Sequence, residues 1–428
     1  MSDSLQHWLV RLQRQHPTAI ELGLERVREV AVRMQLPKPA PCVITVGGTN
    51  GKGSTVAFIE AIARATGLRV GAYTSPHILR YNERVRIDGV DAGDAELVAA
   101  FEAIEAARGD ISLTYFEAGT LAALWLFARA KLDLAILEVG LGGRLDAVNI
   151  VDADVAVITT VDLDHMDWLG EDREDIGTEK AGIARAWKPL ILGDDDPPAS
   201  VLRRAYAIGA SSLRIGCDFF KEHIDADAWR WREPGLTLEL PMPVLPAPVQ
   251  LRNAAVAIAA LRASGLDIPD TAWALGIATA HVQGRLQRLE RDGVEVWLDV
   301  GHNPQAARAL AEWLQGQPKQ GRTHAIYAAL ADKDAAGVTA PLAAHVDDWH
   351  LAGLDVEGRA QSAEALSTRV NLPGATLHGD VGDALRQVRG SAKAGDRVLV
   401  FGSFHTVEAA LRSLRSAQRG EVGARAPL

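Results

Sequence analysis

The chain has 428 residues, of which 48% are hydrophobic and 23% are charged, and it carries a formal net charge of −10. This length favours two domains, the composition excludes a disordered chain, and the negative charge argues against a protein that binds nucleic acid through a basic face. The two cysteines, Cys42 and Cys217, fit no metal-ligand spacing, and neither a basic leader nor a long apolar run is present, so we expect a cytoplasmic protein.

Short apolar runs alternate with helical patterns from residue 42 onward. The runs "CVITV", "RVGAY", "LDLAILEV", "DVAVITTV" and "PLILG" predict buried parallel strands. "WRWREPGLTLELPMP" predicts a hairpin, and the alternation begins again after residue 284. We therefore predict an α/β fold with domains at residues 1–284 and 285–428, ending in a Gly/Ala/Arg-rich tail that frays.

The first predicted strand leads into the loop "VGGTNGKGST" at residues 46–55. The pattern G-x-x-x-x-G-K-[ST] would require glycine at Val46 and a hydroxyl directly after Lys52, where Gly53 stands instead. The order of strand, glycine-rich loop, lysine and helix still predicts a phosphate site, because backbone N–H groups and a helix N-terminus would face the anion. Ser54 or Thr55 could reach phosphate or magnesium. The alternative is a tight turn with a surface lysine.

Polar side chains also follow the next strands, at the edge where open α/β sheets bind ligands. Ser75 follows the second strand, and Glu138 ends a very apolar one, where a carboxylate needs a partner or a metal ion. Arg144, Asp146 and Asn149 follow on a glycine-rich exit loop. The alternatives are an ordinary turn at Ser75, and a helix cap with a surface salt bridge on the exit loop.

Two further candidates lie downstream of the fourth strand. His165 stands among the carboxylates Asp162, Asp164 and Asp167, which makes it a candidate metal ligand. Lys180 lies in the small-residue stretch "EKAGIA". A helical lysine is usually solvated, but these neighbours indicate burial, which would lower the pKa of its amine.

The second domain repeats the arrangement of strand, loop and helix. Asp299, His302 and Asn303 lie between a predicted strand end and a helix start, and Arg285 lies at the domain boundary. A cleft between two α/β domains is the usual place for a small-molecule site.

Ten short motifs occur in one order along the chain: "GTNGKGS", "TSPH", "RYNERVRIDG", "EVGLGGRLDA", "DHMDWLG", "EKAGI", "QGRLQ", "GHNP", "DKD" and "GSFHTV". Over nearly the whole chain this set resembles the folylpolyglutamate synthase/dihydrofolate synthase family of the Mur ligase superfamily. The family loop reads G-T-N-G-K-G-[ST], which accounts for the glycine after Lys52. Three positions depart from the family: Val148 replaces a common Thr, Gly301 replaces the usual Ala, and no histidine precedes Asn253 in "PVQLRN".

The resemblance implies a P-loop-containing Mur-ligase-like ATPase domain, a smaller Rossmann-like domain and an active site in the cleft between them. It implies that ATP phosphorylates a pterin-bearing carboxylate and that the amine of L-glutamate attacks the acyl phosphate, which yields an amide, ADP and phosphate. The segment "TAIELGLERVREVA" resembles that of bifunctional members, which act on dihydropteroate and on tetrahydrofolate and its polyglutamates. The alternative is folylpolyglutamate synthase activity only. We expect a monomer with no nucleic-acid or membrane partner.

The resemblance also assigns residues by position. The ATP phosphates would be bound by Gly48, Thr49, Asn50, Gly51, Lys52, Gly53, Ser54 and Thr55, and the nucleotide would be contacted by Asn253, Arg285, Asp299 and His302. One of two magnesium ions would be held by Ser75 and Glu138, and the other by Glu138, His165 and a carbamylated Lys180. The catalytic set would be Lys52, Glu138, His165, Lys180 and His302, and the substrate-binding set Phe116, Glu117, Arg144, Asp146 and Ala147.

Two other functions compete with this interpretation. A Mur-type ligase for a cell-wall nucleotide precursor should carry an extra N-terminal domain of roughly 80–100 residues, whereas only about 45 residues precede the loop. A P-loop ATPase that drives movement or partner binding would hydrolyse ATP without an amino acid or a pterin acid.

Overall fold

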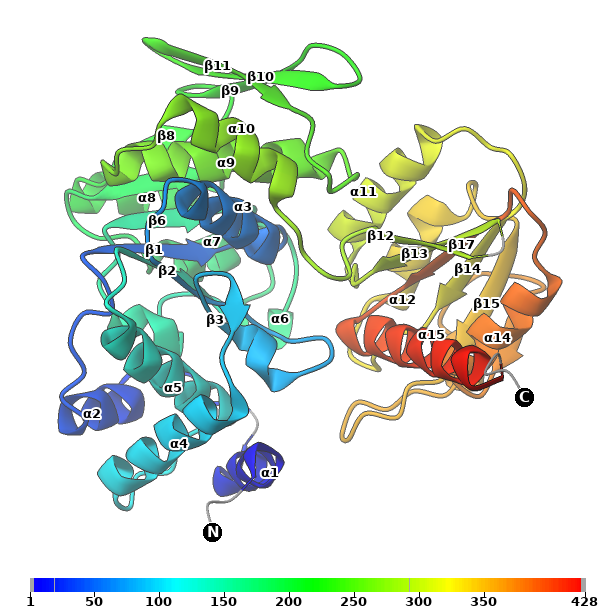
Figure 1. Ribbon diagram of the computed structural model, residues 1–428, viewed down its shortest axis with the longest axis horizontal. Coiled ribbons are helices and arrows are strands. Elements are labelled where there is room, and N and C mark those ends of the chain that lie inside the picture. Colours follow the sequence, from blue (N-terminus) through cyan, green and yellow to red (C-terminus); the bar gives the residue numbers. More distant parts are fainter. Residues whose placement is uncertain (1–3, 19, 292, 425–428) are drawn as a thin grey trace. The chain divides into compact units, whose positions relative to one another are not determined.

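The computed structural model describes residues 4–18, 20–291 and 293–424, and the chain forms two compact units (Figure 1). Unit 1 comprises residues 1–244 and 250–281, and unit 2 comprises residues 245–249 and 282–428. The predicted boundary after residue 284 lies close to the point where the chain enters unit 2. No helix among the described residues has the length and hydropathy needed to cross a membrane.

Unit 1 is built on an eight-stranded sheet with the order β4-β3-β2-β5-β1-β6-β7-β8. The strands pair in parallel except β3 and β4, which are antiparallel. Their bounds are β1 (Cys42–Gly47), β2 (Val70–Tyr73), β3 (Val85–Ile87), β4 (Val90–Asp91), β5 (Leu134–Glu138), β6 (Val155–Ile158), β7 (Pro189–Leu192) and β8 (Ser211–Arg214). The five strands predicted in this region are confirmed. Because β5 lies between β1 and β2, the ends of three predicted strands meet at one edge.

Helices flank this sheet, as the periodicity predicted (Figure 1). They are α1 (Leu5–Gln15), α2 (Glu25–Arg33), α3 (Lys52–Ala65), α4 (Asp94–Arg108), α5 (Tyr115–Ala130), α6 (Met166–Leu169), α7 (Arg173–Ala181), α8 (Ala199–Ile208), α9 (Val249–Ser264) and α10 (Asp270–Thr279), with short 3-10 turns η1 (Tyr81–Arg84) and η2 (Ala147–Ile150). One buried cluster joins alternate strand residues to α1, α2, α4, α5, α7 and α8. Helix α3 packs against β1, β2 and β5 and also against α10.

A small antiparallel sheet with the order β11-β10-β9 belongs to the same unit. It contains β9 (Phe220–His223), β10 (Ala228–Glu233) and β11 (Leu236–Pro241), so the predicted hairpin is confirmed. The indole Nε1 of buried Trp231 donates a hydrogen bond to the carbonyl oxygen of Ala255 (3.1 Å). This bond attaches the small sheet to α9.

Unit 2 has a six-stranded sheet with the order β12-β13-β17-β14-β15-β16, in which β12 alone is antiparallel to its neighbour. The strands are β12 (Gln287–Arg291), β13 (Val294–Asp299), β14 (Thr323–Tyr327), β15 (Asp348–Ala352), β16 (Thr376–His378) and β17 (Arg397–Phe401). The helices are α11 (Pro304–Gln315), α12 (Ala335–Thr339), α13 (Ala363–Ser367), α14 (Val381–Ser391) and α15 (Phe404–Ala424), with a 3-10 turn η3 (Ala340–Leu342). Helices α11, α12 and α13 share one core with the sheet, and α14 and α15 also pack on its strands.

The prediction that the C-terminal tail frays from residue 417 is wrong as far as residue 424, because α15 continues to Ala424. Alanine, glutamine, arginine and glutamate favour helix, and each glycine in the stretch costs only about 1 kcal/mol. Residues 425–428 lie outside the described residues.

Candidate active site

The predicted phosphate loop is a tight turn between β1 and α3. Gly48 has a φ of +142°, and a Cβ at this position would lie 1.9 Å from Thr159 Oγ1. The N–H of Thr49 donates to the carbonyl oxygen of Thr160 (2.8 Å), and the Thr49 hydroxyl donates to the carbonyl oxygen of Asp162 (3.0 Å). These bonds fasten the loop to the segment after β6. Lys52 Nζ donates back to the carbonyl oxygens of Gly48 (2.9 Å) and Thr49 (3.2 Å), so the lysine lies over the loop.

Asn253 of α9 lies against the same loop. Gly51 precedes α3 with a φ of +85°, and a Cβ there would lie 2.5 Å from Asn253 Oδ1. The Asn253 amide donates to Gln250 Oε1 (2.9 Å). The structure thus brings together two segments about 200 residues apart that were both predicted to contact the nucleotide.

Ser75 and Glu138 meet at the ends of β2 and β5. The N–H of Ser75 donates to Glu138 Oε2 (3.1 Å), and Glu138 is 4% exposed. Glu138 also pairs in register with Val46, the last residue but one of β1. A buried carboxylate therefore stands beside the start of the phosphate loop and beside the predicted Ser75 ligand.

Lys180 and Asp146 are both buried, and each interacts through its charge with Lys52. Burial, and then the charge of Lys52, lower the pKa of Lys180 to about 7, although Asp164 and Asp146 oppose the shift. Burial raises the pKa of Asp146 to about 7 against the hydrogen bonds from Leu141 N (2.9 Å) and Val148 N (3.0 Å). The predicted burial of Lys180 is confirmed, since it is 3% exposed. Burial therefore favours the neutral form of the Lys180 amine.

His165 lies on the loop after β6, where it precedes α6 with a left-handed φ of +52°. Its side chain is 38% exposed, and its Nε2 is 3.9 Å from Asp164 Oδ2. Among the described residues, no group of three or more His, Cys, Asp or Glu side chains is placed to hold a metal ion. The grouping of His165 with Glu138 and Lys180 stays a prediction.

The residues predicted to bind the acceptor surround the loop after β5. The ring of Phe116 packs on Gly140, where a Cβ would lie 2.6 Å from the ring, and it is 6.0 Å from the ring of Tyr73. Ala147 is buried in η2, directly after Asp146, and Arg144 pairs with Glu179 at 2.8 Å.

Glu117 of α5 has protein partners for its carboxylate. Its Oε2 accepts from the N–H of Thr114 (2.8 Å) in a capping box, and its Oε1 accepts from Arg26 Nη2 (3.1 Å). Arg26 belongs to α2, within the segment "TAIELGLERVREVA" that resembles that of bifunctional members, although Arg26 itself was not named as a site residue. The structure thus ties the N-terminal segment to the start of α5, next to Phe116.

In unit 2, Arg285, Asp299 and His302 gather around the loop after β13. Asp299 is 8% exposed and accepts from the N–H groups of Leu286 (2.9 Å) and Gly301 (2.7 Å). Burial raises the pKa of Asp299, and the charge of Arg285 opposes the shift. His302 Nδ1 is 2.9 Å from the carbonyl oxygen of Val300, and both Arg285 and His302 lie near the ring of Phe404.

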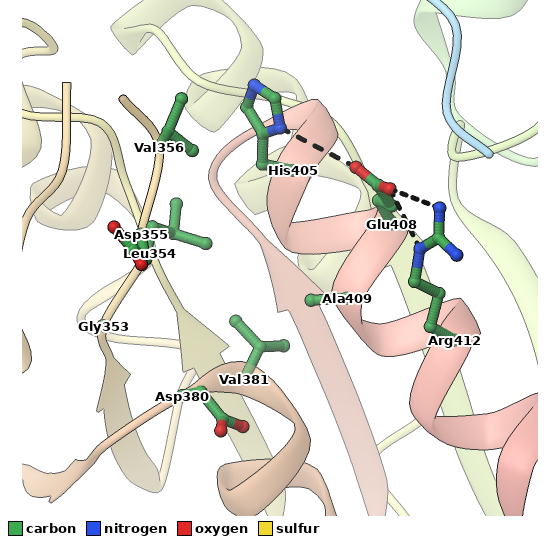
Figure 2. Close-up of a pocket in the computed structure, with 10 residues that line it drawn as sticks. All are labelled: Gly353, Leu354, Asp355, Val356, Asp380, Val381, His405, Glu408, Ala409 and Arg412. Carbon is green, nitrogen blue, oxygen red and sulfur yellow. Dashed lines mark hydrogen bonds and ion pairs between the residues drawn. The ribbon is translucent and has the colours of Figure 1, made fainter. Parts of the chain in front are cut away.

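A pocket of about 270 Å³ lies elsewhere in unit 2, between the loop after β15 and the helices α14 and α15 (Figure 2). Figure 2 shows Glu408 between His405 and Arg412 on α15, at 3.8 Å and 2.8 Å respectively. None of the predicted site residues lines this pocket.

Comparison with known proteins adds family evidence to this geometry. Residues 46–261 match the Mur ligase middle domain, and residues 284–404 match the Mur ligase, glutamate ligase domain. The chain is 49% identical to the dihydrofolate synthase/folylpolyglutamate synthase of Escherichia coli K12, over 94% of each chain. It is 42% identical to the protein of that name from Haemophilus influenzae, over 94% of this chain and 96% of the relative. The chain belongs to the dihydrofolate synthase/folylpolyglutamate synthase family.

Solved structures of this family agree with the fold. E. coli FolC in complex with DHPP and ADP superposes with a TM-score of 0.93 at 48% identity, over 98% of this chain and 99% of that chain. A bifunctional family member with Mn, AMPPNP and L-glutamate bound gives a TM-score of 0.90 at 48% identity, over 97% and 98% of the two chains. The predicted family, the α/β fold and the assignment to ATP-dependent ligases are confirmed.

Proposed function

We propose that this chain is a bifunctional ligase that uses ATP to join L-glutamate to dihydropteroate and to add further glutamates to tetrahydrofolate and its polyglutamates. The observation that carries the proposal is the phosphate loop bearing Lys52, packed against Asn253 and beside the buried pair Asp146 and Lys180. The family's complexes with ADP, with AMPPNP and with L-glutamate support the same substrates. Folylpolyglutamate synthase activity alone is the alternative.

The reaction would proceed in two steps, phosphoryl transfer and then amide formation. A carboxylate oxygen of the acceptor attacks the γ-phosphorus of ATP, the bond to the β-phosphate oxygen breaks, and ADP leaves an acyl phosphate behind. The neutral amine of glutamate then attacks the acyl carbon, phosphate departs, and the amine loses a proton to give the amide. Lys52 and the N–H groups of Gly48 to Thr55 would bind the phosphates and stabilise the charge that develops on them.

The residues at the strand ends fit a divalent cation. Ser75 and buried Glu138 offer the hard oxygen ligands that Mg²⁺ prefers. Two bound Mg²⁺ ions would screen the negative charges of the nucleotide and the acceptor. Glu138 and His165 would share the second ion with Lys180.

An unmodified lysine does not fit that second site, because its amine offers no anionic oxygen and, when protonated, places a positive charge beside Lys52. Its pKa of about 7 leaves a neutral amine that can add to CO₂ and release a proton, which gives a carbamate with anionic oxygens. We therefore propose that Lys180 is carbamylated. The ¹³C NMR spectrum of the protein in ¹³C-bicarbonate should contain a carbamate signal that a Lys180→Met variant lacks.

The remaining predicted residues would place the substrates. Phe116 would stack on the pterin or aminobenzoate ring, with Arg144, Asp146 and Ala147 along the same loop. Glu117 would act from the start of α5. Arg285, Asp299 and His302 of unit 2 would contact the nucleotide or the transferred phosphoryl group. We propose a monomer, since one chain supplies all of these groups, and a cytoplasmic location.

The deciding experiment measures phosphate release with ATP, Mg²⁺ and L-glutamate, using either dihydropteroate or tetrahydrofolate, and identifies the products by mass. Turnover with both acceptors is expected. Turnover with tetrahydrofolate alone would contradict the bifunctional proposal and favour the alternative. ATP hydrolysis that needs neither acceptor would reject the ligase function.

A further inference from the structure

Arg86 and Glu60 form an ion pair in unit 1 for which no role was predicted. Arg86 lies in β3 and Glu60 lies in α3, the helix that follows the phosphate loop. Arg86 Nη2 is 2.7 Å and its Nε is 3.0 Å from Glu60 Oε2. The Glu60 side chain is 7% exposed and that of Arg86 is 21% exposed. The pair therefore links the phosphate-binding helix to the strand that adjoins β2.

The remaining nitrogen of the Arg86 guanidinium reaches the loop that carries Ser75. Arg86 Nη1 donates to Thr74 Oγ1 (3.1 Å) and to the carbonyl oxygen of Glu83 (3.0 Å). The Thr74 hydroxyl itself donates to the Glu83 carbonyl (3.3 Å). Thr74 directly precedes Ser75, whose N–H donates to Glu138 Oε2. One peptide unit thus separates the residue held by Arg86 from the Ser75–Glu138 contact.

The far end of the same loop has a separate attachment. The carboxylate of Glu83 accepts from the N–H groups of Ile78 (2.7 Å), Leu79 (2.9 Å) and Arg80 (2.8 Å). These bonds fix residues 78–80 but not Thr74 or Ser75. At the Ser75 end, the N–H of Thr74 donates to the carbonyl oxygen of Arg84 (2.8 Å), and Arg86 adds a charged side-chain contact to the Thr74 hydroxyl.

Arg86 also interacts with Glu138 through its charge. Burial lowers the pKa of Arg86, but the charges of Glu60, Asp91 and Glu138 outweigh burial and raise it.

We propose that Arg86 is a positioning residue for the metal-binding end of the site: held by Glu60, it fixes Thr74 and so keeps Ser75 beside Glu138. The inference rests on the proposed metal-binding function of Ser75 and Glu138. A planar guanidinium suits this role because its separate nitrogens donate to Glu60 and to Thr74 at the same time. A lysine offers a single nitrogen. Partners that orient metal ligands typically affect metal affinity by about 10- to 100-fold.

The test measures AMPPNP binding to the full chain by calorimetry, once with Mn²⁺ and once in EDTA. The dissociation constant in EDTA divided by the dissociation constant with Mn²⁺ gives the metal contribution. In Arg86→Met this ratio should fall by about tenfold, while the affinity in EDTA stays unchanged. Arg86→Lys and Glu60→Gln each keep part of the network and should show smaller losses. If Arg86→Met does not fold, these two variants provide the comparison.

Ile87→Ala is the matched control, since Ile87 is the next residue of β3, packs on the core and pairs in register with Gly71. It should lower thermal stability and leave the ratio as in the parent protein. An unchanged ratio in folded Arg86 variants, or an equal fall in Ile87→Ala, would overturn the inference and leave the proposed function intact. A parent protein that binds AMPPNP equally with Mn²⁺ and in EDTA would overturn the proposed metal site, and this inference with it.

Discussion

Both units bury titratable side chains, and the contrast between the two groups is instructive. In unit 1, Asp146 and Lys180 lie in loop and helix segments next to the phosphate loop. In unit 2, three histidines lie within neighbouring strands: His324 in β14, His350 in β15 and His378 in β16. We call these three residues the histidine row. Burial shifts pKa values in both places.

The partners of the two groups differ. His350 Nδ1 is 3.0 Å from His378 Nε2, and His324 Nδ1 is 3.2 Å from Asp348 Oδ2. The row therefore pairs with itself and with neighbouring strand residues. Asp146 and Lys180 instead interact through their charges with Lys52 of the phosphate loop. A shifted pKa thus points to a ligand site only when the group also adjoins a segment that can bind a ligand.

The largest expected effect tests the unit 1 side of this comparison. Replacing Lys180 with Met should lower kcat by about 10²- to 10³-fold, the usual cost of removing one preorganised stabilising group. The same variant should lose the ¹³C-carbamate signal, and in the parent that signal should weaken as the pH falls through about 7, because protonation removes the neutral amine. Lys188→Met, at a lysine 49% exposed, is the control. Equal kcat values in Lys180→Met and Lys188→Met would contradict the catalytic role proposed for Lys180.

The histidine row should affect stability and not catalysis. Burial, and then the charges of His378 and His324, lower the pKa of His350 to about 4, and Asp348 opposes the shift. The unfolded chain therefore binds the proton more tightly, so stability is fully present above pH 6.5 and decreases as the pH falls towards 4. The full shift would correspond to about 3 kcal/mol, and solvent screening of the partly exposed ring makes the loss smaller. Urea unfolding at several pH values should show it.

His350→Gln serves as the control for that measurement. It removes the titrating ring, so the dependence of the unfolding free energy on pH between 4 and 6.5 should become flatter. A large fall in kcat at neutral pH in this variant would instead place the histidine row in the reaction.

A smaller effect is expected at Glu117. Glu117→Gln keeps the shape of the side chain but removes the charge that pairs with Arg26, so the start of α5 beside Phe116 should loosen. We expect the KM for dihydropteroate to rise by about tenfold, since misplacing a substrate contact by about 1 Å can cost up to 10²-fold. The KM for ATP should not change. Glu105→Gln, in an ion pair on α4, should leave both constants unchanged.

The smallest expected effect is at Arg80. Its pair with Asp94 has side chains 66% and 62% exposed, so solvent screens it. Arg80→Ala should change the unfolding free energy by less than about 0.5 kcal/mol and leave metal-dependent AMPPNP binding as in the parent. A clear loss of that binding would show that Arg80 also positions the loop after β2, and would contradict the assignment of this role to Arg86.

The sequence predicted the alternation of strands and helices well because burial on both sides makes parallel strands uniformly apolar. It also predicted the phosphate loop and the burial of Lys180, since small residues flank that lysine. It did not give the strand order, which places β5 between β1 and β2 and so brings Glu138 to Ser75. The role of Arg86 was not predictable either, because its partner Glu60 lies 26 residues away and no local pattern records the pairing.

Gly51 also bears on how the chain tolerates mutation. Its left-handed backbone disfavours any side chain, and Asn253 Oδ1 already occupies the space of a Cβ. Gly67 has a similar φ of +88° but no atom within 4 Å of its Cβ position. In a saturation library whose growth depends on this enzyme, position 67 should accept asparagine. Position 51 should stay glycine even if residue 253 is varied at the same time, because a smaller side chain at residue 253 leaves the left-handed backbone of Gly51 unchanged.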